Sequence, residues 1–366
     1  MPRLPPGRRL RGAVVGYGFI ASEGHVPAYL ERASRAQDVE LVAVADVCAP
    51  RLDAARLALP QARLYESAEA LLAREADCLD FVDIATPPCD HASIAHQALD
   101  AGLHVLCEKP LSTSVAEGRS LLEHARRVER VLFPCHTYQH APVVQAVREV
   151  LRSGSIGRVR GVTLNTFRTT HARGTPEWRP DWRRERRYSG GGIAMDHGSH
   201  SFYLAFEWLG AYPSAVTAKL FNLGGARWDT EDNVSSVLTF PTGFAQAHLS
   251  WTAGIRKVLY TLQGERGAIT VDDDDLEVAV RQQAESPGAH IERSRVSSQW
   301  TDASHVSWFN SLFEQFRAAL EEGRWVSPET EDALVCLQVI DAVYRSAANG
   351  SRDLPLSPDT PGEDGR

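Results

Sequence analysis

The feature that most constrains this fold is an apolar run that leads directly into a glycine pattern. GAVVG at residues 12–16 has the composition of a buried strand, and it continues into GYGFIA at residues 16–21, which has the spacing G-x-G-x-x-A. Gly16 permits a tight turn, and Gly18 lets a phosphate group come close to the backbone. The amides of the helix that follows face such a phosphate. The pattern predicts a strand–turn–helix unit that binds a dinucleotide, with contacts from Gly16, Gly18, Phe19 and Ile20.

An acidic residue at the end of the second strand pattern supports this interpretation. VELVAVAD at residues 39–46 ends in Asp46, and its spacing from Gly18 is longer than the usual interval of about 20 residues. A carboxylate at this place accepts hydrogen bonds from an adenosine ribose and repels a 2′-phosphate. The sequence therefore favours NAD over NADP, although Arg51 lies nearby and could pair with a 2′-phosphate. The alternative is a glycine turn that serves only the fold.

The first third of the chain alternates apolar runs with helical patterns. This alternation predicts a parallel, doubly wound sheet, and ligands bind outside the carboxyl ends of the strands in such a sheet. The predicted strands are at residues 12–16, 39–46, 79–86 and 104–108, and the predicted helices are at residues 26–36, 50–58, 67–75 and 92–102. Further cofactor contacts are expected near the ends of the later strands, from Thr86, Pro87, His91, Glu108 and Lys109.

The pattern changes after about residue 135. Alternating strands follow with few helices between them, which predicts an α+β domain built on a large open and mostly antiparallel sheet. The strands are expected at residues 159–167, 214–223, 233–240, 244–251, 257–264 and 267–272, and a closing helix is expected at residues 330–350. The expected organisation is an α/β chain with a nucleotide-binding domain at 9–134 and a substrate and oligomerisation domain at 135–354. Residues 1–8 and the Pro/Gly/Asp-rich residues 355–366 are expected to be disordered.

The composition argues against several classes of function. The net charge of −8 offers no electrostatic footprint for nucleic acid, and no apolar run approaches the roughly 20 residues that span a bilayer. The basic N-terminal segment MPRLPPGRRLRG lacks the apolar region of a secretory signal. The six cysteines are scattered without a disulfide or zinc spacing, so the thiols are expected to be reduced and the protein cytoplasmic.

Lysine is rare in this chain, and one lysine directly follows a predicted strand. Lys109, Lys219 and Lys257 are the only lysines among the 39 basic residues. A lysine can give up its proton where an arginine cannot, so Lys109 in the segment VLCEKPL is a candidate for proton chemistry. The alternative is a solvated lysine in a loop.

A second candidate group lies in the segment SGGGIAMDHGSH at residues 189–200. If a helix begins here, Asp196 and His200 stand at i and i+4 and share one face. The three glycines ahead of it let a ligand or another backbone come close. The alternative is a polar pair on a helix surface.

Taken together, the motifs resemble those of the Gfo/Idh/MocA oxidoreductases, a family that includes glucose–fructose oxidoreductase and inositol dehydrogenase. The resemblance covers nearly the whole chain, through GYGFIA, ATPPCDHASIAHQALDAGLHVLCEKPL, SGGGIAMDHGSH and EDALVCLQVIDAVYRSAANG. It implies a Rossmann domain, a C-terminal domain whose open sheet forms a homodimer or homotetramer, and NAD(P)-dependent oxidation or reduction of a small polyhydroxy substrate. It also implies that the catalytic trio is Lys109, Asp196 and His200.

Each member of this trio has a chemical role in hydride transfer from a secondary alcohol. His200 is the expected base, because an ordinary histidine pKa of about 6.5 suits neutral pH. Lys109 would donate a hydrogen bond to the substrate oxygen as that oxygen gains negative charge. Asp196 would orient His200 or bind a neighbouring hydroxyl.

Because the sequence departs from the family pattern at two positions, the substrate of a family member cannot be assigned to this chain. Gln139 stands where many members have an arginine, and Tyr203 stands where many have Asp or Asn three residues after the histidine. Both are expected near the substrate pocket. The basic run at residues 179–187 either binds a phosphate or carboxylate of the substrate, such as a sugar nucleotide, or is a solvated loop. Tryptophans either line the pocket or belong to the core, namely Trp178, Trp182 and Trp251.

Three alternatives to a metal-free dehydrogenase follow from the same residues. A metal site among closely spaced residues lacks a complete motif, so no metal is expected, although the candidate ligands are His136, His140, Asp196, His197 and His200. An NAD-assisted glycosidase would oxidise and re-reduce its substrate without net NADH. A non-catalytic nucleotide-binding regulator is the third alternative, but it has no need of Lys109 and His200 together.

Overall fold

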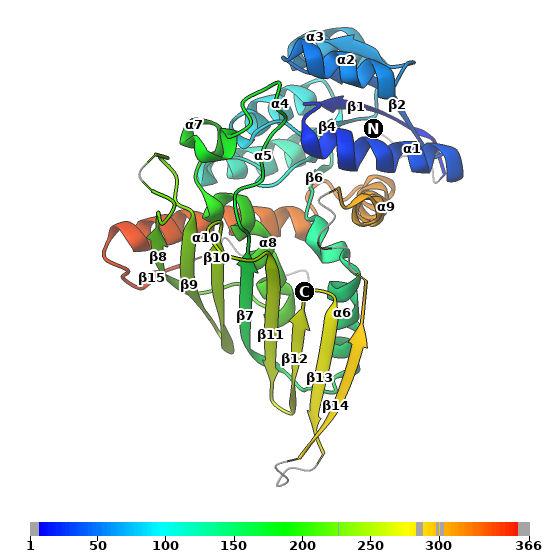
Figure 1. Ribbon diagram of the computed structural model, residues 1–366. Helices are drawn as coiled ribbons and strands as arrows, with labels where there is room; N and C mark the ends of the chain where they lie inside the picture. Colours follow the sequence, from blue (N-terminus) through cyan, green and yellow to red (C-terminus); the bar gives the residue numbers. More distant parts are fainter. Residues whose placement is uncertain (1–6, 226, 283–287, 298–299, 301–303, 358–366) are drawn as a thin grey trace.

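A six-stranded sheet forms the first half of the molecule (Figure 1). The computed structural model describes residues 7–225, 227–282, 288–297, 300 and 304–357. The strand order is β3-β2-β1-β4-β5-β6, and every pair is parallel. The strands are β1 Leu10–Val15, β2 Val39–Ala45, β3 Arg63–Tyr65, β4 Phe81–Ile84, β5 His104–Cys107 and β6 Leu132–Pro134. The predicted doubly wound sheet is confirmed, and the strand order reverses between β1 and β4.

Helices connect these strands and cover the sheet. All the helices predicted for this region are present, and Ser67 and Ser114 cap two of them by accepting hydrogen bonds from the backbone N–H groups of Ala70 and Glu117. The helical segments are η1 Ala21–His25, α1 Val26–Arg35, α2 Ala49–Ala58, α3 Ala68–Glu75, η2 Ala76–Cys78, α4 Pro88–Asp100 and α5 Val115–Val128.

A nine-stranded mixed sheet forms the second half, in the order β14-β13-β12-β11-β7-β10-β9-β8-β15. Only the β10–β7 pair is parallel among these paired strands, so the predicted, mostly antiparallel sheet is confirmed. The strands are β7 Val159–Phe167, β8 Ala215–Phe221, β9 Asn233–Phe240, β10 Gly243–Ser250, β11 Lys257–Gly264, β12 Gly267–Asp272, β13 Asp275–Arg281, β14 Ala289–Arg295 and β15 Leu354–Pro355.

Helices pack against one face of this second sheet. α8 Ile193–Leu209 and α10 Pro328–Ala348 contact its strands, as Figure 1 shows. Residues of β9 alternate between buried and exposed, so that Val234 and Leu238 face the helices while Val237 faces away. The remaining helical segments of this half are η3 Thr137–His140, α6 Pro142–Ser153, η4 Trp182–Arg184 and α7 Arg186–Ser189.

One helix that the sequence analysis missed returns to the first sheet. α9 Val306–Glu322 packs beside the Rossmann sheet although it lies far along the chain (Figure 1). Phe313 contacts Phe81 in a tilted arrangement, and Phe316 contacts Phe81 and Phe133. The apolar face of α9 therefore completes the core on one face of the first sheet.

Most residues of the two chain ends that were expected to be disordered, 1–6 and 358–366, lie outside the described residues. Of the described ones, Arg8 pairs with Asp80 at 2.7 Å, and Pro355 pairs with Ala215 in the second sheet. No helix within the described ranges has the length and apolar character needed to cross a bilayer.

Candidate active site

A cavity of about 590 Å³ lies at the carboxyl ends of the Rossmann strands and extends to the second domain. The predicted site residues that line it are Gly16, Gly18, Phe19, Ile20, Asp46, Arg51, Thr86, Pro87, Glu108, Lys109, Asp196 and His200. His91 is the exception among the predicted cofactor contacts. Its buried ring lies 2.8 Å from each of two backbone carbonyls, those of Thr86 and Pro110. His91 therefore contacts the backbone of two residues that line the cavity without lining it itself.

The glycine turn has the space that a pyrophosphate needs. Gly16 has a φ of +92°, and a Cβ atom there would lie 2.8 Å from the backbone of Ala85. A side chain at Gly16 would therefore force β1 and β4 apart. A Cβ atom at Gly18 would meet nothing within 4 Å, so this side of the turn is open. The first turn of η1 follows at Ala21. These features fit the phosphates of a dinucleotide at a helix N-terminus.

Asp46 stands at the end of β2, where a ribose would lie. Its carboxylate accepts hydrogen bonds from the backbone N–H groups of Tyr17 at 2.6 Å and Cys48 at 2.7 Å. Arg51 donates through Nε to the carbonyl of Tyr17 at 2.8 Å, and its Nη1 lies 3.8 Å from Glu177 Oε2. The guanidinium group is thus already held by a carbonyl and a carboxylate. Further lone pairs on Asp46 remain available to hydroxyl donors.

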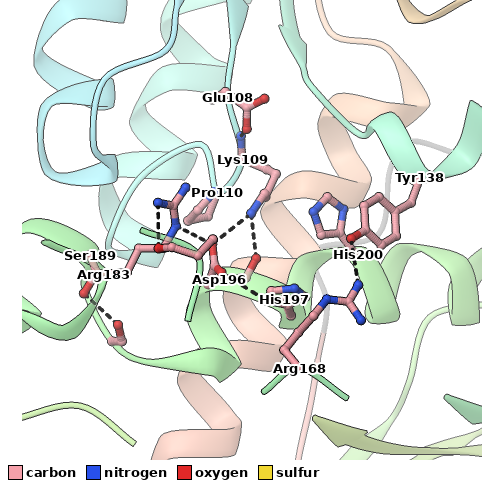
Figure 2. A network of polar contacts seen from close by, with 12 residues as sticks. Glu108, Lys109, Pro110, Tyr138, Arg168, Arg183, Ser189, Asp196, His197 and His200 are labelled. Carbon is pink, nitrogen blue, oxygen red and sulfur yellow. Dashed lines mark hydrogen bonds and ion pairs between the residues drawn. The ribbon is translucent and has the colours of Figure 1, made fainter. Parts of the chain in front are cut away.

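Lys109 reaches from the end of β5 to the first turns of α8 (Figure 2). Its Nζ donates to the backbone carbonyl of Asp196 at 2.7 Å and lies 3.2 Å from Asp196 Oδ1. Its backbone N–H donates to the carboxylate of Glu108 at 3.0 Å. The side chain is 14 % exposed, so it is held in the cavity wall rather than free in solvent. The structure does not support a solvated loop lysine.

Asp196 is the centre of a cluster of positive charge. Besides Lys109, its carboxylate lies 3.4 Å from Arg183 Nε and 3.0 Å from His197 Nδ1. Burial raises the pKa of Asp196, but Lys109, His197 and Arg183 outweigh it and hold the pKa well below its ordinary value. Asp196 is therefore a carboxylate that positions cations, chiefly Lys109.

His200 is oriented by Tyr203 and not by Asp196. Its Nδ1 lies 2.7 Å from the hydroxyl oxygen of Tyr203, which also accepts a hydrogen bond from the backbone N–H of Tyr138 at 3.1 Å. The ring stacks on that of Tyr138 with centroids 3.8 Å apart (Figure 2). Burial and the charge of Lys109 lower the pKa of His200 well below its ordinary value. His200 is thus a neutral imidazole with Nδ1 occupied, which leaves Nε2 as the free ring nitrogen.

A buried network that the sequence analysis missed supports the segment before Lys109. His25 Nδ1 lies 2.9 Å from Asp83 Oδ2, which also accepts from the Tyr29 hydroxyl at 3.0 Å. His25 Nε2 lies 3.3 Å from Glu108 Oε1. Although burial lowers the pKa of His25, Asp83 and Glu108 raise it to about 9. The only sequence signal was Asp83 itself, a charge inside the apolar strand pattern FVDI that calls for a buried partner.

The basic run at residues 179–187 proves to be largely paired within the protein. Arg184 lies 3.6 Å from Asp232, while Arg187 and Arg179 lie 2.7 Å and 3.9 Å from Glu185. Arg183 alone among its arginines lines the main cavity. Trp178 and Trp182 also line the cavity, whereas Trp251 is buried away from it.

The two departures from the family pattern lie behind the cavity rather than in it. Gln139 is buried, and its carbonyl accepts a hydrogen bond from the Gln145 side chain at 2.7 Å. Tyr203 contacts His200 from the side away from the lining. Some residues that line the cavity were not selected from the sequence, among them Thr137, Tyr138, Arg168 and Arg256. Arg168 could have been found, because it directly follows the carboxyl end of a predicted strand.

The described residues contain one group with a spacing that suits a metal ion, made of His25, Glu108 and Cys135. This group contains none of the candidate metal ligands that the sequence analysis named. Since a ligand histidine must be neutral, the raised pKa of His25 argues against a metal there. All six cysteines of the chain are free.

Several characterised proteins are similar to this chain. D-apiose dehydrogenase of Paraburkholderia graminis is 36 % identical over 150 residues, which cover 41 % of this chain and 38 % of that protein. D-xylose 1-dehydrogenase (NADP(+)) 2 of Haloferax volcanii is 28 % identical over 92 % of this chain and 98 % of its own length. Inositol 2-dehydrogenase of Rhizobium meliloti is 27 % identical over 91 % of this chain and 97 % of its own.

Solved structures share the fold over nearly the whole length. GenD2 from gentamicin A biosynthesis, solved in complex with NAD, matches with a TM-score of 0.79 and 27 % identity over 98 % of this chain and 99 % of that one. Levoglucosan dehydrogenase in complex with NADH and L-sorbose matches with a TM-score of 0.81 and 22 % identity over 96 % and 99 % of the two chains. At 22 % identity, the match to levoglucosan dehydrogenase shows only that the fold is shared.

Both halves of the chain match models of one family. Residues 10–136 match the oxidoreductase family model with an NAD-binding Rossmann fold, and residues 144–270 match the GFO/IDH/MocA C-terminal domain. The glycine turn, the segment ending in Lys109 and the start of α8 fall within these two ranges and meet at one cavity. The chain belongs to the Gfo/Idh/MocA family of oxidoreductases.

Proposed function

We propose that this protein is an NAD-dependent dehydrogenase or reductase that acts on a secondary alcohol or ketone of a small polyhydroxy compound. The observation that carries the proposal is the meeting of Lys109, Asp196 and His200 in the cavity that the glycine turn opens. The named dehydrogenases of sugars and cyclitols among its relatives support the same substrate class. NAD, when bound, supplies the hydride acceptor.

The roles of the three side chains follow from their contacts. His200 is neutral and holds Tyr203 through Nδ1, so Nε2 receives the hydroxyl proton of the alcohol. This requires the tautomer in which Nδ1 carries the proton, with the two lone pairs of the Tyr203 oxygen accepting both N–H groups. Lys109 donates to the substrate oxygen as negative charge develops there. Asp196 is a positioning residue that fixes Lys109.

A preference for NAD over NADP is supported by the end of β2. Asp46 carries its negative charge where a 2′-phosphate would have to lie, and two backbone N–H groups hold it in place. Arg51 is engaged by Tyr17 and Glu177, so it would have to leave both to bind a phosphate. These contacts oppose the arrangement that recognises NADP.

The test is a screen of polyols, cyclitols and nucleotide sugars, with NADH and NADPH formation followed separately. We expect NADH to form with at least one class. Lys109→Ala should then abolish turnover and leave NAD binding nearly intact, because Lys109 contacts the substrate rather than the glycine turn. Arg160→Ala, which removes an exposed cationic side chain of β7 away from the cavity, serves as the control. Full activity of Lys109→Ala would remove the mechanism.

The same screen separates the alternative functions. An NAD-assisted glycosidase would release a sugar from a glycoside and form no net NADH. A regulator would bind NAD and turn over none of the compounds.

We infer that the exposed face of the nine-stranded sheet joins copies of the chain into a homodimer or homotetramer. Phe221, Val237 and Phe244 lie on that face, 39 %, 44 % and 43 % exposed. Light scattering of Val237→Lys against the native protein tests this, and dissociation is expected. A cytoplasmic location is likewise proposed, because the six free thiols suit a reducing compartment.

A further inference from the structure

Two arginines, Arg168 and Arg256, line the substrate end of the cavity. Arg168 follows β7, and Arg256 precedes β11. The guanidinium of Arg168 donates to the carbonyl of Phe167 at 2.9 Å and lies 3.5 Å from the Tyr138 hydroxyl, as Figure 2 shows. Within the ranges of the chain that the structure describes, neither arginine forms an ion pair. This contrasts with the paired arginines of residues 179–187.

The two guanidinium groups act on each other. Burial lowers the pKa of Arg256, and the positive charge of Arg168 lowers it further. The nearby carboxylate of Asp273 raises the pKa of Arg256, but by less than burial and Arg168 lower it. Its oxygens also accept from the Val258 N–H at 2.8 Å and face Lys257 Nζ at 3.2 Å. Two partly buried like charges without a counterion are unfavourable, so an anion between them would be bound strongly.

The balance of charge around them points the same way. The lining as a whole has five cationic side chains and five carboxylates, but its charged residues from the second domain are three arginines and one carboxylate, which is a net charge of +2. The carboxylate, Asp196, already faces Lys109 and Arg183. The whole chain has a formal net charge of −8, so this positive region runs against the composition. A neutral sugar would leave that charge uncompensated.

We propose that Arg168 and Arg256 form an anion subsite that holds a carboxylate or phosphate group on the polyhydroxy substrate. The inference rests on the proposed function for the identity of the site, and it adds the chemical class: a sugar acid or a sugar phosphate rather than a neutral sugar. The planar guanidinium groups bind either anion in bidentate fashion. The subsite lies beside His200 and Lys109, so it would fix which hydroxyl faces them.

A binding experiment tests the subsite without requiring turnover. D-glucuronate, D-glucose 6-phosphate and D-glucose are titrated calorimetrically into the NADH-bound protein. We expect at least one of the two anions to bind about 10- to 100-fold more tightly than D-glucose, as for a lost charge-assisted contact. Arg256→Gln and Arg168→Gln should remove that advantage, and Arg256→Lys should retain part of it. Arg160→Gln removes an exposed arginine of β7 that pairs with Glu265 away from the cavity, and it serves as the matched control.

The outcomes separate the subsite from the reaction. Equal affinities for the anions and D-glucose, or an anion preference that survives both substitutions, would overturn the subsite and leave the dehydrogenase proposal untouched. Anion binding that depends on Arg256, without NADH formation from any compound, would support the subsite and count against the reaction. The preference of D-glucuronate over D-glucose 6-phosphate, or the reverse, identifies the anion as carboxylate or phosphate.

Discussion

On the Rossmann side of Lys109 a buried histidine is a cation, whereas on the other side buried histidines are neutral. His25 is 1 % exposed and His200 is 6 % exposed, so burial alone cannot explain the difference. Asp83 and Glu108 raise the pKa of His25 to about 9, against the effect of burial. Burial lowers the pKa of His200, and Lys109 lowers it further. Between His25 and His200, the sign of the neighbouring charge therefore decides the protonation state.

The two histidines accordingly serve different purposes. Both nitrogens of His25 face carboxylates, so its charge ties the β4 and β5 ends together and leaves nothing for a substrate. His200 has one nitrogen on Tyr203 and one free. His25 therefore holds its side of the cavity in place, whereas His200 keeps one nitrogen for the proton transfer proposed above. The effects expected on the two sides of Lys109 can be measured separately.

The largest expected effect is the loss of turnover in His200→Ala. A positioned general base contributes about 10²- to 10⁴-fold to rate, so kcat should fall by about 10³-fold. NADH binding, measured by fluorescence titration, should remain within a few-fold of the native value. A variant that keeps native kcat would place the base elsewhere.

The next effect is a loss of stability in His25→Gln. The folded pKa of about 9 lies above the unfolded value of 6.5, so the charge of His25 contributes stability below pH 6.5 and loses it as the pH rises through about 9. The contribution is on the order of 3 kcal/mol. Urea unfolding should show a large difference between variant and native protein at about pH 6 and a smaller one at about pH 10. An equal difference at both would mean that His25 is not charged.

A smaller effect is expected for Tyr203→Phe, which removes the hydroxyl that fixes the ring of His200. We expect kcat to fall about fivefold with little change in KM, since one neutral hydrogen bond is worth about 1 kcal/mol. Thermal unfolding serves as the control for the lost contact to the Tyr138 backbone. If kcat and its pH profile match those of the native enzyme, Tyr203 only fills space.

The smallest effect concerns acid stability and His136. Burial, with the charges of His140 and Lys109, lowers the pKa of His136 to about 3, so only the unfolded chain takes up its proton near pH 6.5. Stability is therefore lost as the pH falls below 6.5, by about 1 kcal/mol near pH 5.5. His136→Phe keeps the stacking on Tyr203 and should lose that much less on acidification. If the free energy of unfolding of both proteins falls equally as the pH is lowered, His136 is not neutral in the folded protein.

The Rossmann half was predictable because its signals are local. Apolar runs ended at Gly16, Asp46, Thr86 and Lys109, and the parallel topology places such ends along one edge. α9 was missed although Phe309, Leu312, Phe313 and Phe316 follow helical spacing, because a run of strand patterns before it suggested more of the same. β14 was missed because its residues are exposed and polar, so no alternation marks it.

The charge states of the site were not predictable from sequence. Whether a histidine is charged depends on partners that the fold supplies, as Asp83 does for His25 over a gap of 58 residues. Nor could the sequence show that Asp196 contacts Lys109 while Tyr203 contacts His200. The basic run attracted attention by its density, yet the unpaired arginines are isolated in sequence and come together only through the strands β7 and β11.

The return of α9 to the first sheet has a consequence for how the protein is made. A ribosome releases Phe81 and Phe133 long before Phe313 and Phe316, which complete their core (Figure 1). The N-terminal domain therefore cannot finish folding as soon as its own strands have emerged, as N-terminal domains commonly do. Until α9 arrives, α1 covers part of one face of the first sheet, and the part of this face that α9 covers in the finished fold stays exposed.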